Sequence, residues 1–102
     1  MRQAKVFNHH TFAGILTETD DGRYTFEYTH DYAGKPVSLS MPVGKHFFEF
    51  DNFPPFFDGL LPEGAQLDAL LKRAKLDKND LFGQLLTVGK DLVGSVAVGP
   101  LS

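Results

Sequence analysis

The stretch from Phe12 to Thr29 reads FAGILTETDDGRYTFEYT, and it decides the fold. Apolar and polar residues alternate on both sides of Asp21-Gly22, which is a strong hairpin signal because glycine accepts the positive φ of a tight turn. The returning half carries three aromatic residues at every second position: Tyr24, Phe26 and Tyr28. We therefore expect strands at residues 12–19 and 23–29, with one aromatic face that needs apolar cover.

Four other segments have the pattern of strands or extended chain. Residues 5–7 predict a short opening strand, and Val37 to Met41 predicts another. Residues 44–51 are expected to be extended, and the β-branched residues between Leu92 and Val98 predict a strand that returns to the sheet. The order indicates an α+β fold, in which a small, mostly antiparallel sheet from the N-terminal hairpins plus a C-terminal strand packs against two to three helices.

The second half of the chain carries the helical patterns. Pro55 suits the first turn of a short helix that Pro62 ends and that carries Phe56, Phe57, Leu60 and Leu61. A second helix is predicted by the apolar stripe of Leu67, Leu70, Leu71 and Ala74. Asp77 is predicted to be the N-cap of a third helix that stops at Gly89. Gly83 costs this helix about 1 kcal/mol relative to alanine, which suggests close packing against a neighbouring element.

The composition is that of one soluble module. A chain of 102 residues suits a single domain over residues 1–102 and leaves no room for a second core. Its formal net charge of −3 supplies no basic surface for phosphates, so direct nucleic-acid binding is not expected. Cysteine is absent, and neither a signal peptide nor a membrane-spanning run is recognisable. We expect a cytoplasmic protein that does not bind a membrane.

The residues with chemical potential do not form a recognisable active site. The four histidines lack the spacing of metal ligands: His9, His10, His30 and His46. The paired carboxylates of Asp20-Asp21 and of residues 77–80 are explained by turn formation and helix capping. No glycine-rich loop has the spacing and the lysine that cradle a phosphate. We therefore expect no catalytic residue, no metal and no cofactor.

Six of the ten phenylalanines lie between Phe47 and Phe57, in a segment punctuated by prolines. Either these side chains build the core, or some of them wait for a partner. The core interpretation is favoured for most of them, because the aromatic face of the sheet needs apolar cover. Only a minority is left to face a partner.

Three segments together resemble a known family. They are Val37-Ser38-Leu39-Ser40-Met41-Pro42, Phe56-Phe57-Asp58-Gly59-Leu60-Leu61-Pro62-Glu63-Gly64 and Leu85-Leu86-Thr87-Val88-Gly89-Lys90-Asp91-Leu92-Val93-Gly94-Ser95-Val96. In order and spacing they are similar to the N-terminal subdomain of HipA-type toxin kinases. The resemblance covers nearly the whole chain, up to Pro100, and the combination is far more specific than any one segment.

The resemblance implies a partner rather than a reaction. In that family the subdomain precedes a Ser/Thr kinase core, whose ATP-binding and catalytic loops do not occur in these 102 residues. The chain is similar to the stand-alone, HipS-like antitoxins of three-part HipBST toxin–antitoxin systems. Such a protein would bind and inhibit a separate HipT-like Ser/Thr kinase toxin, in a complex with a HipB-like DNA-binding protein. The free kinase would phosphorylate an aminoacyl-tRNA synthetase and stop translation.

The candidate partner-binding site is the turn and helix start that comprises Leu61, Pro62, Glu63, Gly64, Ala65 and Gln66. A stiff proline and a flexible glycine would project residue 65 outward, where it could plug a cleft of the partner. Stand-alone relatives tend to carry a bulky aromatic residue there. Ala65 departs from that pattern, which is expected to weaken inhibition more than binding. In a purely structural interpretation, Glu63 only complements the helix dipole.

Two other interpretations stay open. The chain could be the N-terminal subdomain of a longer HipA-type kinase, in which it helps to position the catalytic core. It could also be a generic protein-binding adaptor with a target unrelated to kinases, because a fold does not determine a function.

Overall fold

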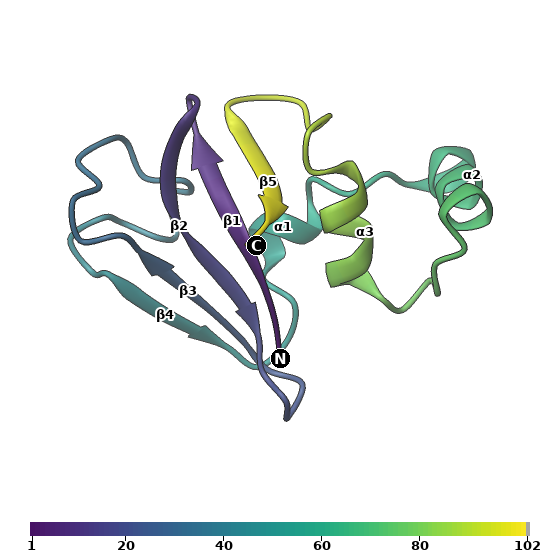
Figure 1. Cartoon of the computed structure of the whole chain (residues 1–102), viewed down its shortest axis with the longest axis horizontal. Coiled ribbons are helices and arrows are strands. Elements are labelled where there is room, and N and C mark those ends of the chain that lie inside the picture. The colour runs from purple at the N-terminus through teal and green to yellow at the C-terminus, as the bar shows by residue number, and fades with distance from the viewer. Residues whose placement is uncertain (102) are drawn as a thin grey trace.

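The computed structural model describes residues 1–101, which form a five-stranded antiparallel sheet and three helices (Figure 1). In chain order the elements are β1 (Arg2–Asn8), β2 (Thr11–Glu18), β3 (Tyr24–Tyr28), β4 (Phe47–Phe50), α1 (Pro55–Asp58), α2 (Gly64–Ala74), α3 (Leu81–Val88) and β5 (Val96–Pro100). The strands lie in the order β4-β3-β2-β1-β5. The predicted α+β fold is confirmed, including the return of the C-terminal strand to the sheet.

The central hairpin forms where the sequence predicts it. Gly22 has a φ of 83° in the turn, and the antiparallel ladder places Leu16 opposite Phe26 and Gly14 opposite Tyr28. Phe26 is completely buried, and its ring lies edge-on to Tyr28 at 4.9 Å between centroids. The aromatic face of β3 is therefore the inner face of the sheet.

Strands β1 and β5 have other bounds than predicted. β1 begins at Arg2 instead of residue 5, because its ladder with β2 extends to the pair Arg2 and Glu18. β5 begins at Val96 instead of Leu92, at the point where it pairs with Asn8 at the end of β1. Both bounds are set by pairing with a neighbouring strand. The alternation of apolar and polar residues along a single strand does not reveal that pairing.

Helices α1 and α3 cover the inner face of the sheet. Phe57 of α1 and Phe82 and Leu85 of α3 are fully buried, and the Phe26 and Phe57 rings lie 6.2 Å apart. α3 contacts both β5 and α2, so it lies between the sheet and α2 (Figure 1). Burying a side chain of this size contributes about 1.5–3 kcal/mol, so this layer supplies much of the stability.

The phenylalanine-rich segment serves mainly the core, as predicted. Phe48, Phe53 and Phe57 are buried, and Phe50 and Phe56 pack against the same cluster. Phe47, on the edge strand β4, is 43% exposed.

Residues 29–46 connect β3 to β4 without a further strand. The buried Tyr28 hydroxyl donates a hydrogen bond to the carbonyl of Met41 and accepts one from the Val37 amide at 2.9 Å. Burial also raises the pKa of Tyr28, which keeps its hydroxyl a donor. The Tyr28 hydroxyl therefore satisfies the Val37 amide and the Met41 carbonyl, and the Ser40 and Met41 amides bond locally to Ser38. The predicted strand at residues 37–41 is wrong, and only a single bridge joins Ser38 to Met41.

Helix α1 is shorter than predicted. It ends at Asp58, and the amides of Leu60 and Leu61 bond to the carbonyls of Phe57 and Asp58, three residues back, as in a turn. The chain has left the helix before it reaches Pro62, so this proline does not end it.

The N-cap of α3 is Asp80, not Asp77 as predicted. The Asp80 carboxylate accepts a hydrogen bond from the Gly83 amide at 3.1 Å, whereas Asp77 accepts one from the Asn79 amide in the preceding turn. A Cβ at Gly83 would lie 2.8 Å from Cγ of Asp80. Glycine therefore makes room for the cap of its own helix, and the expected packing against a neighbouring element is not the reason for it.

Candidate functional site

The predicted site connects α1 to α2. Leu61 is buried in the core, and Pro62 is half-buried beside it. The next four residues are all exposed: Glu63, Gly64, Ala65 and Gln66. The segment thus has an anchored half and a half that is accessible to a partner.

Gly64 sets the direction in which α2 leaves this turn. Its φ is 58°, and no atom lies within 4 Å of a Cβ placed on it, so the backbone conformation and not crowding favours glycine. Glu63 precedes it in an extended conformation, and its side chain makes no capping hydrogen bond. No capping hydrogen bond therefore accounts for Glu63, but its exposed side chain lies at the N-terminus of α2, where a negative charge complements the helix dipole.

A cleft of about 440 Å³ borders the anchored half, and we call it the Pro62 cleft. One wall comes from the α1–α2 connection and α2, and includes Leu61, Pro62, Gln66 and Arg73; the other comes from the end of α3 and the loop after it, and includes Val88, Asp91, Leu92 and Val93. The structure thus brings together the second and third segments that carry the family resemblance.

The second wall of the Pro62 cleft was not part of the predicted site. Its most accessible apolar residue is Val93, which is 92% exposed, whereas Leu92 packs against the core. An apolar Val93 followed by Gly94 was the available signal in the sequence. That signal does not reveal which segment lies opposite Val93, because the two walls of the cleft meet only through the packing of α3 beside α2.

A charged network fastens α3 to the sheet. Arg2 pairs with Glu18 on β2 and with the capping Asp80, each at 2.7 Å, and its guanidinium lies 5.1 Å from the centre of the Phe82 ring. Hydrogen bonds from Arg2 lower the pKa of both carboxyl groups, and those bonds raise the pKa of Arg2 itself. Burial, followed by the Glu18 charge, raises the pKa of Tyr24. The network holds the helix whose far end forms the second wall.

The lining of the Pro62 cleft is partly apolar and partly charged. Apolar side chains line the Pro62 cleft together with the charged groups of Arg73 and Asp91, a combination that suits burial against a protein partner. Within residues 1–101, no three or more histidine, cysteine or acidic side chains are grouped so that they could bind a metal ion. None of the helices in that range combines the length and the apolar character needed to cross a membrane.

The chain is similar to proteins of two different lengths. It is 36% identical to an uncharacterized protein of Haemophilus influenzae over 98 residues, a match that covers 96% of this chain and 92% of that protein. It is 37% identical over 95 residues to the candidate kinase Y4dM of Sinorhizobium fredii, which covers 83% of this chain and only 23% of Y4dM.

The similar solved structures also include one short chain and one much longer chain. A solved N-terminal domain of HipA toxin superposes with a TM-score of 0.79 at 33% identity, over 100% of this chain and 94% of that one. HipA of Shewanella oneidensis MR-1, solved with HipB and its operator DNA, shares the fold with a TM-score of 0.77 at 23% identity; the match covers 97% of this chain and 24% of that HipA. The sequence pattern of the HipA N-terminal domain matches residues 4–99. The chain therefore belongs to the HipA N-terminal domain family.

Proposed function

We propose that this protein is a cytoplasmic antitoxin that binds a separate HipA-like Ser/Thr kinase, of the HipT type, and holds it inactive without covalent chemistry. In this proposal a HipB-like protein supplies DNA binding to the same complex. The kinase, when free, phosphorylates an aminoacyl-tRNA synthetase.

The observation that carries the proposal is the difference in length between two relatives of this chain. The Haemophilus influenzae relative is little longer than this domain, since the match covers 92% of it, whereas in Y4dM the domain amounts to 23% of the chain. The same fold therefore occurs both nearly alone and attached to a much longer protein. A separate copy that docks on a kinase lacking the domain would restore the arrangement of the longer protein.

The Pro62 cleft and the exposed start of α2 are the proposed contact surface. Rigid anchoring of Leu61 fixes the position of Ala65 relative to the core, and the exposed Val93 offers an apolar side chain on the opposite wall. Interface hot spots are usually few, and they fill pockets of the partner. In this proposal residue 65 occupies the position of such a side chain. The alanine side chain is small, so it fills little of a pocket in the partner.

The test is to co-express the chain with the HipA-like kinase encoded beside its gene, and to measure co-purification and kinase activity. Co-elution together with lost activity supports the antitoxin role. A kinase that neither co-elutes with the chain nor loses activity in its presence contradicts the proposal.

Ala65→Trp tests the position of the inhibitory contact. Tryptophan at this exposed site should strengthen inhibition of the kinase by about tenfold or more, since a well-seated aromatic contributes about 2 kcal/mol or more. Ala33→Trp is the matched control, because Ala33 is also exposed but belongs to the connection between β3 and β4, and those two strands lie at the opposite end of the molecule from α2 (Figure 1). Equal inhibition by the parent protein and by both variants would rule out a role for residue 65.

A second function, that of an integral N-terminal domain of a kinase, has its own support. The chain spans about a quarter of the length of Y4dM and of the Shewanella oneidensis HipA. A reading frame that continues past residue 102 into a kinase core would favour this function. In that case the Pro62 cleft would contact the core of the same polypeptide.

A further inference from the structure

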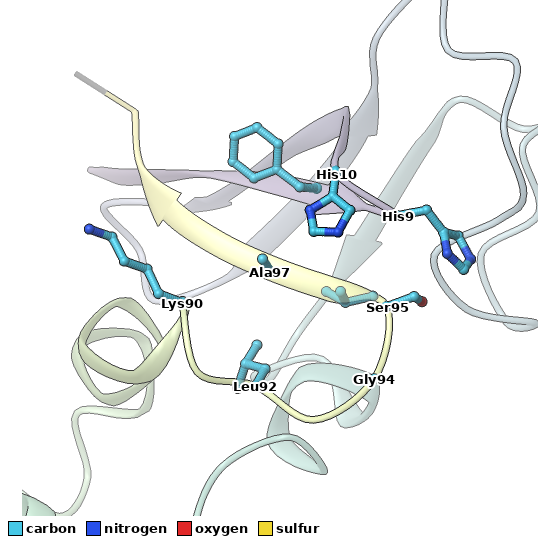
Figure 2. Close-up of a pocket in the computed structure, with 9 residues that line it drawn as sticks. His9, His10, Lys90, Leu92, Gly94, Ser95 and Ala97 are labelled. Carbon is cyan, nitrogen blue, oxygen red and sulfur yellow. The ribbon is translucent and has the colours of Figure 1, made fainter.

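A second hollow, of about 700 Å³, lies on the other side of the loop that follows α3, and of its lining residues only Leu92 also borders the Pro62 cleft. We call it the His10 pocket. Figure 2 shows its labelled side chains: His9 and His10 from the turn between β1 and β2, Lys90 just after α3, and Ala97 on β5. His10 and Lys90 lie on either side of Ala97, and the His9 ring is turned away from the His10 ring.

Backbone hydrogen bonds hold the two walls of the His10 pocket in place. The His9 amide donates to the carbonyl of Ser95 at 2.9 Å, which ties the histidine turn to the start of β5. On the other side, the Val98 amide donates to the carbonyl of Gly89 at 2.9 Å, which presses the end of α3 against the same strand. Lys90 therefore follows directly from a fixed point, and the pocket is a built feature of the fold.

The histidine turn does not carry the residues that its shape favours most. His9 and His10 have φ values of 49° and 67°, and two successive positive φ angles in a two-residue hairpin loop define a turn that favours Asn-Gly. Neither imidazole is buried, so packing in the core does not explain them. Residues kept in sparsely populated conformations are a recognised pointer to a functional site.

The charge of the pocket is opposite to that of the whole chain. The formal net charge is −3, yet the ionisable side chains that line the hollow are Lys90, His9 and His10, and no carboxylate lines it among the described residues. The Ser95 hydroxyl donates to Oδ1 of the buried Asn8 at 2.8 Å, so its proton is already engaged. Donors for a ligand are thus the Lys90 ammonium and the imidazole N–H groups.

The floor between these donors is apolar. Phe7 and Ala97 form a cross-strand pair on β1 and β5, and Leu92 completes the lining on the loop side. The Phe7 ring also contacts Phe12, with centroids 5.8 Å apart, which leaves an aromatic surface on this face of the sheet. An inorganic ion would leave this surface unused, whereas a ligand with an aromatic body would cover it.

We propose that the His10 pocket binds an aromatic anion, a carboxylate or phosphate monoester carried on a ring. The anionic group accepts from the Lys90 ammonium and from the His10 imidazole, and the ring covers Phe7 and Ala97. Lys90 supplies a charge-assisted hydrogen bond, the stronger of the two. The inference does not rest on the kinase contact, because it concerns the chain alone.

The test is a titration of the complete 102-residue chain at low salt, followed by amide chemical shifts, with phenyl phosphate as the probe. Saturable shifts confined to the His10 turn, Lys90 and Ala97, with a Kd of about 1 mM or tighter, are expected. Benzylamine, an aromatic cation, should not bind, and inorganic phosphate should bind more weakly than phenyl phosphate. Shifts that do not saturate, that map elsewhere, or that are the same for benzylamine would overturn the proposal.

Two variants separate the pocket from the fold. Lys90→Ala should weaken phenyl phosphate binding by about tenfold, whereas the matched control Lys72→Ala, an exposed lysine on α2, should leave it within about twofold. The double variant His9→Asn, His10→Gly gives the turn its preferred residues, so it should keep the fold and weaken the binding of phenyl phosphate. Unchanged affinity in both variants would refute the site.

A second arm of the same titration distinguishes a free small molecule from a protein segment as the source of the anion. It compares phenyl phosphate with a short phosphotyrosine peptide. Phenyl phosphate that binds as tightly as a short phosphotyrosine peptide supports a free small molecule as the ligand. A peptide that binds at least about tenfold more tightly supports the same chemical group on a protein segment. Failure of both ligands overturns the inference and leaves the kinase proposal untouched.

Discussion

Gly89→Ala should destabilise the protein more than its chemical simplicity suggests. A Cβ at this position would lie 2.7 Å from the carbonyl carbon of Val98, nearer still to the carbonyl oxygen, and 3.0 Å from the Val98 Cβ. Contacts between a Cβ and other atoms are ordinary only from 3.4 Å upward, so the end of α3 has to move away from β5. The backbone of Gly89 itself is helical, so the cost comes from crowding alone.

Two terms give the magnitude. Forcing extra volume into a packed contact costs about 1–3 kcal/mol. The same movement stretches the 2.9 Å hydrogen bond from the Val98 amide to the Gly89 carbonyl, which contributes about 1 kcal/mol. The free energy of unfolding should fall by about 2–4 kcal/mol. For a domain of this size each kcal/mol lowers Tm by about 4–8 °C, so a fall of about 8–32 °C is expected.

Urea unfolding followed by circular dichroism measures this loss, with Gly99→Ala as the matched control. Gly99 lies on the same strand β5, and no atom lies within 4 Å of a Cβ placed there. The control should therefore leave stability unchanged or raise it by up to about 1 kcal/mol, because alanine restricts the unfolded chain. A Gly89→Ala protein within about 0.5 kcal/mol of the parent would refute the reasoning, since the end of α3 would then be free to move.

Two further perturbations test the core and the charged network. Phe57→Ala removes a fully buried ring and should cost about 3–5 kcal/mol in urea unfolding, whereas Phe47→Ala, at a 43% exposed position, should cost less than about 1 kcal/mol. The pKa values of Glu18 and Asp80 are lowered in the folded state by hydrogen bonds from Arg2. Their contribution is therefore complete above the unfolded pKa values, near pH 4, and is lost as pH falls through the lowered folded values. The groups are partly exposed, so the loss should be no more than about 1 kcal/mol per pair, and Arg2→Ala should reduce it; a stability that has the same pH dependence in both proteins would count against the network.

Local patterns predicted most of the elements because they depend on neighbours in the chain. The Asp21-Gly22 turn and the alternation on both sides of it specify the hairpin of β2 and β3, and the apolar stripe specifies α2. The strand predicted at residues 37–41 failed for a non-local reason. The Tyr28 hydroxyl, from another element, bonds the Val37 amide and the Met41 carbonyl, which a neighbouring strand would otherwise have paired.

The Leu61–Gln66 segment shows how far a sequence goes toward a site. A proline, a charged residue and a glycine ahead of an apolar stripe were sufficient to predict an exposed turn before a helix, and residues 63–66 are indeed exposed. Its role in binding a kinase stays a prediction. The facing wall, with Asp91 and Val93, was missed because its distance from Pro62 depends on the packing of α3.

By itself, the sequence of this protein determined the α+β class, the central hairpin, the amphipathic helix α2 and the motifs of the HipA N-terminal domain family. Those features follow from backbone preferences and from periodicities of two and 3.6 residues, which act within a few neighbouring residues. Only the tertiary structure decided that Pro62 and Val93 line one cleft, and that His10 and Lys90 line one pocket on either side of Ala97. Both the cleft and the pocket depend on one arrangement, in which α3 ends against β5 at Gly89. The contact that fixes this arrangement joins Gly89 to Val98, which are separate in the sequence.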